Sequence, residues 1–468
     1  MASFADAFPP IALGALDGRY RDAVVPLVEH LSEAALNRRR VHVEVEWLIH
    51  LTSNAVVPGV RALTAEEQGA LRTIVDNFGP GDIAELAELE RETAHDVKAV
   101  EYYLKRRLPL IVGGSAAGMC ELIHFACTSE DINNLSYALM VKGAVEEVWL
   151  PRAKALVEAV AIMARGLRAV PLLARTHGQP ATPTTMGKEL AVLAFRLQRQ
   201  LARIGRSEYL GKLNGATGTY GAHVAAVPNA NWPAISEAFV ESLGLQWNPL
   251  TTQIESHDWQ AELYSDMARF NRILHNLCTD VWTYISMGYF AQVRGQGTVG
   301  SSTMPHKVNP IRFENAEANL EVANALLDVL ASTLVQSRMQ RDLTDSSMQR
   351  NIGTAFGHSL LAIDNAGRGL AGLDAVPAAM AADLDANWEV LGEPIQSAMR
   401  ALGAQGVAGM ENPYERLKEL TRGRRLTGDD IGEFVTSLGL PPDVELRFLE
   451  MTPQTYVGLA PVLVDYLG

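Results

Sequence analysis

Side chains that can move protons and hold negative charge gather in one run, GSSTMPHKVNP at residues 300–310. Pro305 and Pro310 fix φ and exclude the run from a helix interior, so we expect a loop. A helix over 311–336 is predicted to follow at once, because Pro310 stands just ahead of its first turn. Free N–H groups at a helix N-terminus attract anions, so this loop is suited to hold a negatively charged substrate.

A second polar segment, ARTHGQPATP at 174–183, lies between two long predicted helices. Its histidine, His177, is followed by a glycine and two prolines, so it stands in a loop and not on an apolar helix face. A lone loop histidine is usually only a surface residue. The position of His177 at the end of a long helix, like that of 300–310, makes it a candidate for proton transfer.

A third segment, CTSEDINN at 127–134, offers two interpretations. Thr128 or Ser129 is suited to cap a helix, with Glu130 or Asp131 in its first turn. The same hydroxyl and N–H groups are suited to bind an anion, and the sequence leaves both interpretations open.

Two more segments carry many polar side chains. TTQIESHD at 251–258 precedes another long helix. SRMQRDLTDSSMQR at 337–350 contains three arginines and two aspartates. These arginines form either internal ion pairs or a clamp for phosphate or carboxylate, and composition alone does not decide between the two.

The elements that must position these segments are long helices. In the middle of the chain, apolar residues recur at alternating spacings of four and three, which is typical of nearly parallel helices in a bundle. Five such runs cover 156–167, 186–204, 263–288, 316–334 and 356–370. No segment shows a convincing strand alternation, so the predicted fold class is all-α.

Some apolar residues of these helices lie off the main seam. They are Val192, Ala194, Val322 and Val329. They fit either an oligomer formed through the bundle or a larger core within one chain, and periodicity alone leaves both open.

Three helical domains are predicted. Residues 1–117 form an N-terminal domain with helical patterns at about 22–53 and 64–77, and it ends near the small-residue break at 113–118. Residues 118–370 form the central long-helix bundle, and 371–468 form a small C-terminal domain of short helices separated by prolines.

Composition excludes several classes of protein. The 468 residues carry a net charge of −14, which disfavours binding to nucleic acid or to an anionic membrane. The three cysteines form no CxxC, the N-terminus has no secretory pattern, and no apolar run approaches ~20 residues, so we expect a cytoplasmic protein without a membrane span. Motifs for dinucleotides, nucleotide phosphates or metals are missing, so no cofactor and no metal are predicted.

The run at 300–310 resembles the signature loop of the fumarase/aspartase superfamily, GSSxMPxKxNP, at every defined position. Within that superfamily, HDVKAVEYYL, HFACTSEDINN, RTHGQPATP, TTQIESHD and SRMQRDLTDSS resemble segments of bacterial adenylosuccinate lyases. The resemblance extends from Asp17 to Pro453 and so covers essentially the whole chain.

This resemblance implies a homotetramer whose subunits share a central bundle, which favours the oligomer over the larger core. It implies small-molecule substrates and sites that combine loops from more than one subunit. The implied reaction releases fumarate from adenylosuccinate, giving AMP, and from succinylaminoimidazole carboxamide ribotide (SAICAR), giving AICAR, in purine biosynthesis.

Roles for individual residues also follow from the resemblance. Ser301 is the expected general base and His177 the expected general acid. His95 is expected beside the substrate phosphate, and Lys307 and Asn309 at the succinyl carboxylates. The full set of expected substrate-binding residues is Arg19, Tyr20, His95, Asp96, Thr128, Ser129, Gln253, Ser302, Lys307, Asn309, Asn315, Arg341, Ser346 and Arg350.

One residue departs from the family pattern. Ala94 stands before His95-Asp96, where relatives commonly have asparagine. If that asparagine contacts substrate in the relatives, a hydrogen bond is missing here, and we expect weaker binding without loss of turnover.

The sequence leaves two alternative functions. One is another fumarate-releasing lyase of the superfamily, against which TSEDINN and the arginine-rich 338–350 argue. The other is a helical assembly protein that has lost activity, against which the intact set of Ser301, Lys307, Asn309 and His177 argues.

Overall fold

The computed structural model describes residues 12–292, 304, 307–421 and 425–468. The chain forms two compact units. Unit 1 comprises Met1–Ala153, Gln200–Arg272 and Ala318–Asp364, and unit 2 comprises Lys154–Arg199, Ile273–Glu317 and Asn365–Gly468. Each unit combines three separate segments of the sequence, so the units do not test the predicted division into 1–117, 118–370 and 371–468, which stays a prediction.

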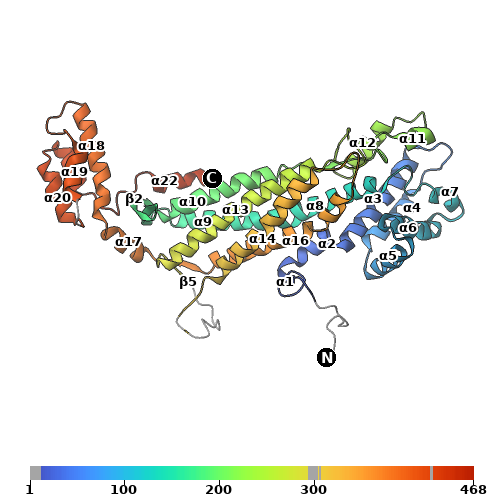
Figure 1. The fold of residues 1–468 in the computed structure, drawn as a ribbon, viewed down its shortest axis with the longest axis horizontal. Helices are drawn as coiled ribbons and strands as arrows, with labels where there is room; N and C mark the ends of the chain where they lie inside the picture. The colour runs from blue at the N-terminus through green and yellow to red at the C-terminus, as the bar shows by residue number, and fades with distance from the viewer. Residues whose placement is uncertain (1–11, 293–303, 305–306, 422–424) are drawn as a thin grey trace. The chain divides into compact units, whose positions relative to one another are not determined.

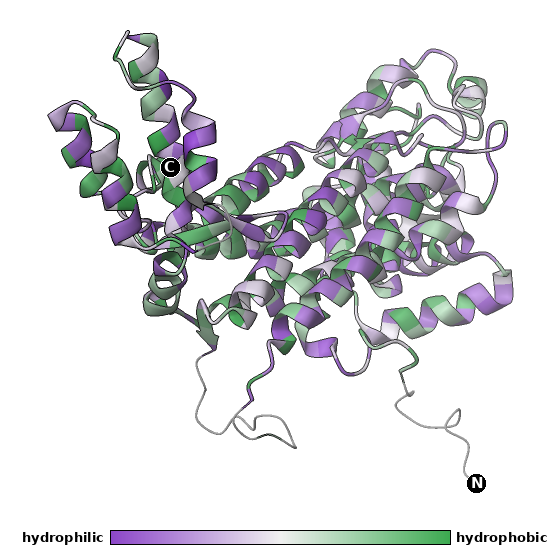
Figure 2. Cartoon of the chain, turned by 60° about the vertical axis from the view of Figure 1, so that its left-hand side comes forward, coloured by the Kyte–Doolittle hydropathy of each residue, from purple (hydrophilic) through white to green (hydrophobic). Residues whose placement is uncertain are grey.

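Five long helices confirm the five apolar runs (Figure 1). They are α9 (Leu150–Gly166), α10 (Met186–Ile204), α13 (Asp258–Ser286), α14 (Ile311–Leu334) and α16 (Ile352–Leu370). Each contributes residues to both units. Figure 2 shows hydrophobic and hydrophilic residues mixed along such helices, as expected when one stripe is buried.

The off-seam residues divide into an exposed and a buried group. Val192, Val322 and Val329 are exposed, whereas Ala194 is buried. Exposed valines on long helices leave apolar surface uncovered in the single chain.

Unit 1 begins with short helical pieces and not with one helix. Its N-terminal elements are α1 (Arg21–Val24), a 3-10 turn (Val25–Leu27), α2 (Val28–Leu31), α3 (Glu33–Ser53), α4 (Ala65–Asp76), α5 (Pro80–Thr93), α6 (Asp96–Val112), a 3-10 turn (Gly113–Ser115) and α7 (Ala116–Cys120). The predicted continuous helix over 22–53 is therefore wrong. Ser32 is extended, and its side chain accepts a hydrogen bond from the N–H of Ala35 at 3.1 Å, which starts a new helix.

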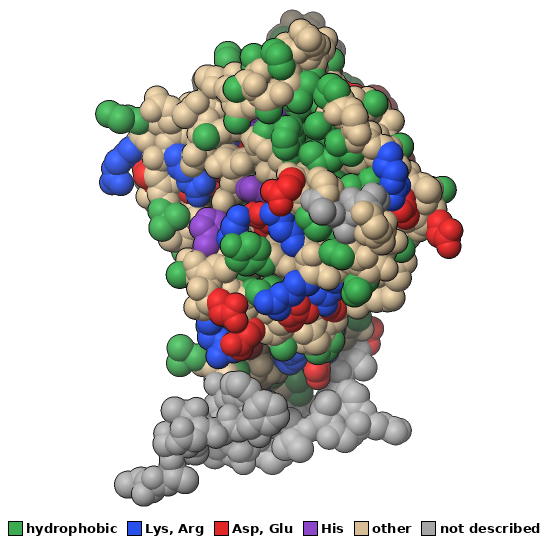
Figure 3. All heavy atoms as spheres, turned by 90° about the vertical axis from the view of Figure 1, so that its right-hand side faces the viewer, with side chains coloured by type: hydrophobic (Ala, Val, Ile, Leu, Met, Phe, Trp, Pro, Cys, Tyr) green, Lys and Arg blue, Asp and Glu red, His purple; other side chains and the backbone are tan. Residues whose placement is uncertain are grey.

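Helices α3 to α6 enclose a core that contains Val41, Val100 and Tyr103. On the face viewed in Figure 3, basic and acidic side chains lie next to one another. Among the helices of this core, Arg107 of α6 pairs with Asp82 at 3.0 Å and with Glu85 at 2.8 Å. Such pairing distributes the charge without forming a basic patch.

The rest of unit 1 is also mainly helical. Helix α8 (Ser129–Gly143) continues through a π-helical turn (Ala144–Trp149) into α9, and α11 (Gly221–Ala226), α12 (Trp232–Ser242) and α15 (Thr344–Gln349) are shorter. Two short strands, β3 (Leu210–Gly211) and β4 (Gln246–Trp247), pair in parallel.

Unit 2 contains two antiparallel strand pairs. A hairpin is formed by β1 (Pro171–Thr176) and β2 (Gln179–Thr185), and β5 (Phe290–Gln292) pairs with β6 (Leu373–Ala375). The sequence showed no convincing strand alternation, and these short strands were not expected, but the chain is mainly helical and the predicted all-α fold class is confirmed. The prolines of β1 and β2 hide any alternation, and strands of two or three residues are too short to show one.

Short helices complete unit 2. They are α17 (Pro377–Asp385), a 3-10 turn (Trp388–Leu391), α18 (Gly392–Ala404), α19 (Pro413–Thr421), α20 (Gly428–Ser437), α21 (Pro442–Leu449), α22 (Ala460–Leu463) and a 3-10 turn (Val464–Leu467). They have a core of their own, around Leu391, Met399 and Val435. Within the described part of the chain, every helix is too short or too polar to span a bilayer.

Candidate active site

The N-terminus of α8 places Thr128 and Ser129 at the surface of unit 1. Thr128 is the N-cap, and its N–H donates to the carboxylate of Asp131 at 2.8 Å. Asp131 also forms a fully buried ion pair with Lys212 at 2.8 Å, which anchors this helix end. The predicted capping is confirmed, and anion binding by the same hydroxyls stays a prediction.

His95 lies close to Ser129. The Nε2 atom of His95 is 3.4 Å from Ser129 Oγ, and its Nδ1 accepts a hydrogen bond from the N–H of Lys98 at 3.2 Å. His95 thereby caps α6 and keeps an exposed ring beside a hydroxyl. Two predicted binding residues from different helices are thus brought together.

Asp96 follows His95 and is held by two arginines. Arg40 donates to it at 2.6 Å, and Arg350 lies 3.5 Å away. Although burial raises the pKa of Asp96, Arg40, the N–H of Val97 and Arg350 together lower it below its ordinary value. The ionised carboxylate therefore fixes Arg350, which also pairs with Glu33.

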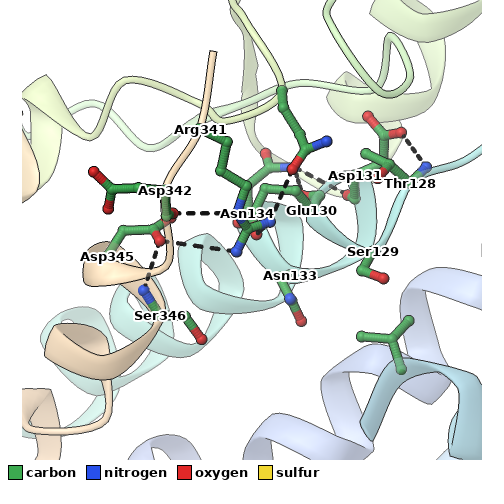
Figure 4. A network of polar contacts seen from close by, with 12 residues as sticks. Thr128, Ser129, Glu130, Asp131, Asn133, Asn134, Arg341, Asp342, Asp345 and Ser346 are labelled. Carbon is green, nitrogen blue, oxygen red and sulfur yellow. Dashed lines mark hydrogen bonds and ion pairs between the residues drawn. The ribbon is translucent and has the colours of Figure 1, made fainter. Parts of the chain in front are cut away.

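Arg341 occupies the centre of a second cluster (Figure 4). We call it the Arg341 cluster, and it comprises Glu130, Gln253, Arg341 and Asp345. Its guanidinium lies 2.7 Å from Glu130 and 3.8 Å from Asp345, and it donates to Gln253 Oε1 at 3.3 Å. Burial raises the pKa of Glu130, and the Arg341 charge opposes that rise.

Two internal ion pairs of 337–350 are confirmed, Arg338 with Asp342 at 3.6 Å and Arg341 with Asp345 at 3.8 Å. Most partners lie outside the segment itself, on α8, α3 and α6. A clamp for an anion stays a prediction, since paired arginines on fixed carboxylates can still present free N–H groups.

An open hollow of about 680 Å³ adjoins the Arg341 cluster. Its lining comes from Ala216, Thr217, Gln253 and 338–343. Ser346 lies nearby, on α15, and its N–H donates to Asp345 at 2.7 Å. This arrangement surrounds a concave surface with donors, as an anionic ligand requires.

Arg19 and Tyr20 lie just ahead of α1. The guanidinium carbon of Arg19 is 5.9 Å from the centre of the Tyr20 ring. A cavity of about 300 Å³ is lined by the adjoining Asp17 and by Glu33 and Arg350 among mostly apolar side chains. The N-terminal turn and the end of 337–350 thus border the same space.

In unit 2, His177 occupies the turn of the β1–β2 hairpin. His177 and Gly178 have φ of 53° and 74°, and Thr176 pairs with Gln179 across the turn. A two-residue hairpin turn with both φ positive matches strand twist, and a glycine adopts it without strain. The imidazole is therefore presented, exposed, at the tip of a rigid hairpin.

The hairpin is anchored by a carboxylate of α17. Asp383 accepts a hydrogen bond from Arg175 at 2.8 Å and another from the hydroxyl of Tyr289. Arg175 lies two residues before His177 on β1, so Asp383 restrains the strand that carries the imidazole.

The remaining predicted residues of unit 2 lie just before or within α14. Lys307 and Asn309 are exposed, and the N–H of Lys307 donates to the carbonyl of Met304 at 2.9 Å. Asn315 lies on α14 itself and is half-buried. Ser301 and Ser302 lie outside the described residues.

The described contacts thus join His95 to Ser129, Arg341 to Gln253, and Asp96 to Arg350, all within unit 1. His177, Lys307, Asn309 and Asn315 belong to unit 2. In the part of the chain that the structure describes, no group of three or more His, Cys, Asp or Glu side chains is arranged to hold a metal.

Four residues that surround the predicted site have no expected part in binding or catalysis from the sequence. Glu130 and Asp345 contact Arg341, His257 contacts Asp345, and Asp383 holds Arg175. Glu130, His257 and Asp345 stand inside the quoted motifs, so their segments were identified but their functions were not. Asp383 stands in no motif, and no sequence signal could have found it.

Two family models match the chain. One, described as "Lyase", matches residues 18–323, and the other, described as "Adenylosuccinate lyase C-terminal", matches residues 337–457. Among solved structures, the chain is similar to a fumarate lyase from Mesorhizobium sp. BNC1 (TM-score 0.74, 18% identity, 95% of this chain and 97% of that chain). It is also similar to the 3-carboxy-cis,cis-muconate lactonizing enzyme from Pseudomonas putida (TM-score 0.69, 20% identity, 92% and 93%). At these identities the two structures support the fold alone.

Curated relatives are far more similar in sequence. The chain is 49% identical over 456 residues to the adenylosuccinate lyase of Escherichia coli K12, covering 97% of this chain and 98% of the relative. It is 48% identical over 457 residues to that of Haemophilus influenzae (98% and 98%) and 45% identical over 453 residues to that of Legionella pneumophila strain Corby (97% and 98%). The chain belongs to the adenylosuccinate lyase family of the fumarase/aspartase superfamily.

Proposed function

We propose that the chain is an adenylosuccinate lyase that releases fumarate from adenylosuccinate, giving AMP, and from SAICAR, giving AICAR. The observation that carries the proposal is the 49% identity to an adenylosuccinate lyase over almost the full length of both chains. The cationic side chains Arg341 and Arg350 support it, because the substrate carries a phosphate and two carboxylates.

The reaction divides into two proton transfers. A base removes a proton from the carbon next to a succinyl carboxylate, and the electron pair becomes the new C=C bond of fumarate as the C–N bond breaks. An acid protonates the departing nitrogen. The negative charge that builds up before C–N cleavage needs donors already in place.

We assign the base to Ser301 and the acid to His177, with the remaining predicted residues in binding roles. Lys307 and Asn309 bind the succinyl carboxylates, and His95 lies beside the phosphate. Arg19, Tyr20, Arg341, Ser346 and Arg350 hold the nucleotide end, and Thr128, Ser129, Gln253 and Ser302 line the succinyl and base pocket, with Asp96 and Asn315 completing the set. The rigid hairpin supports the role of His177, since a proton donor must be held in place during C–N cleavage.

The proposed enzyme is a cytoplasmic homotetramer with sites shared between subunits. The exposed valines on α10 and α14 support association, and three free cysteines suit a reducing compartment. Light scattering should give four times the chain mass. Mixing inactive Ser301→Ala and His177→Ala proteins, with dissociation and reassembly, should restore activity if the two residues of one site come from different subunits. No restoration would contradict sharing.

A substrate panel separates this function from that of other fumarate-releasing lyases. Adenylosuccinate and SAICAR should lose their succinyl group, whereas argininosuccinate, malate and aspartate should be unchanged. Turnover of one of the last three in place of adenylosuccinate would contradict the proposal, and a folded protein without any turnover would favour the inactive assembly protein.

A further inference from the structure

His257 is a buried histidine that the proposed reaction does not use. It precedes α13 in the segment TTQIESHD, and it is only 1% exposed. Its φ of 60° is left-handed, which is strained for a residue with a Cβ and is often found next to functional sites.

The ring of His257 faces the Arg341 cluster. Its Nε2 lies 3.5 Å from Asp345 Oδ2, and its Nδ1 lies 3.4 Å from the side-chain amides of Gln260 and Gln349. The Nε2 atom therefore donates to Asp345 whether the ring is charged or neutral.

Asp345 depends on the Nε2 donor of His257 more than the nearby Glu255 does. Glu255, the other carboxylate near the ring, accepts from the N–H of His257 at 2.8 Å, from Trp259 at 3.1 Å and from Asn248 at 2.8 Å. Asp345 is buried, and it contacts the N–H of Ser346, the guanidinium of Arg341 and the ring of His257. Without His257, one of its oxygens loses a donor inside the protein.

The surrounding charge supports this contact. Burial alone lowers the pKa of His257, but the hydrogen bond to Asp345 and the charges of Glu255 and Glu130 raise it above its ordinary value. These carboxylates therefore favour the protonated ring more than burial alone would, and a charge-assisted hydrogen bond to a carboxylate is stronger than a neutral one.

We propose that His257 is a positioning residue: by donating from Nε2 to Asp345 it holds that carboxylate against Arg341 and Ser346, and so fixes the donors that receive the anionic substrate. The inference rests on the proposed function, because it concerns residues assigned to substrate binding. His257 itself touches neither the hollow lining nor a reacting atom.

The test replaces His257 with two amide side chains of different length. A glutamine amide nitrogen can occupy the position of Nε2, whereas that of asparagine reaches only the position of Nδ1. His257→Asn should raise KM for adenylosuccinate about tenfold, the effect of one lost charge-assisted hydrogen bond, with kcat within about threefold. His257→Gln should return KM to within about threefold of the wild-type value.

His223→Asn is the matched control. His223 is equally buried in unit 1, and neither of its ring nitrogens has a hydrogen-bond partner. Its substitution should leave KM unchanged. An unchanged KM in His257→Asn, or a KM in His257→Gln as high as in His257→Asn, would overturn the inference.

A second readout needs no substrate and so separates this inference from the proposed function. His257→Asn and Arg341→Lys should lower Tm non-additively, because both act on Asp345. Additive changes would overturn the positioning role even in an active enzyme. If His257→Asn fails to fold, Asp345→Asn replaces it in the double-mutant cycle with Arg341→Lys. The two substitutions should again lower Tm non-additively. Additive changes in Tm would count equally against the inference. A wild-type protein inactive on adenylosuccinate would contradict the proposed function alone.

Discussion

Arg341 and Glu130 form an ion pair at 2.7 Å in which the Glu130 side chain is 3% exposed and the Arg341 side chain 19%. A carboxylate at this depth costs several kcal/mol unless a cation accompanies it. Arg341, which is assigned to the nucleotide end of the substrate, is therefore also the partner of the buried Glu130 charge. Its role in binding and its role in stability can be separated by experiment.

Arg341→Met should destabilise the fold as well as weaken binding. It leaves Glu130 and Asp345 without their guanidinium, and removing one member of a buried pair lowers the free energy of unfolding by about 3 kcal/mol. Denaturant unfolding measures the loss, and initial rates measure KM, which should rise at least tenfold, about the effect of one lost charge-assisted hydrogen bond.

Arg338→Met is the control for stability, since the Arg338 side chain is exposed and its pair with Asp342 (3.6 Å) contributes little to stability. Adding Glu130→Gln to Arg341→Met should recover stability but not KM. A single variant as stable as wild type would contradict the importance of the pair.

The charge on His257 should give the fold a measurable pH dependence. Its raised pKa means that the folded state holds a proton more tightly than the unfolded state. The resulting stability is fully present below the unfolded pKa of about 6.5 and is lost as pH rises through the folded value. The difference in free energy of unfolding between wild type and His257→Gln should therefore shrink from pH 6 upward. A difference that stays constant or grows with pH would show that the ring is not held as the cation.

Asp383 should affect turnover although it lies outside every motif. Asp383→Asn weakens the charged hydrogen bond to Arg175 that restrains the His177 hairpin, so kcat should fall about tenfold while KM changes less than threefold. Asp385→Asn, an exposed change on the same helix α17, should leave both constants unchanged. Equal kcat values for the two variants would contradict the anchoring role of Asp383.

The departure at Ala94 can be tested with a backbone-matched control. Ala94 has φ of 51°, and Ala55, an exposed residue in unit 1, has φ of 48°. Asparagine tolerates this left-handed conformation better than alanine, so both Ala94→Asn and Ala55→Asn should stabilise the fold by up to about 1 kcal/mol. Only Ala94→Asn should lower KM for adenylosuccinate. If KM is the same in both variants, residue 94 does not contact substrate.

The sequence predicted the long helices well because their apolar periodicity extends over many turns, as in the 29 residues of α13. It failed at the break at Ser32, where one cap interrupts a continuous apolar pattern. It also missed the hairpin of His177, because these proline-containing strands show no alternation of apolar and polar residues and are held by contacts with α17.

Parts of the candidate site were predictable for a different reason. The sequence alone identifies the segments that contain Ser129, Arg341 and His177, because these residues belong to motifs with a known chemical pattern. The contact of His257 with Asp345 joins segments 88 positions apart in the chain, and only the folded structure brings them together.

The central claim is tested most directly by following the ultraviolet spectrum of adenylosuccinate mixed with the purified protein, with released fumarate measured in parallel and Ser301→Ala protein examined alongside. We expect conversion to the AMP spectrum with one fumarate per AMP, and loss of that conversion in the folded variant. An unchanged spectrum with folded wild-type protein, or full activity in Ser301→Ala, would contradict it.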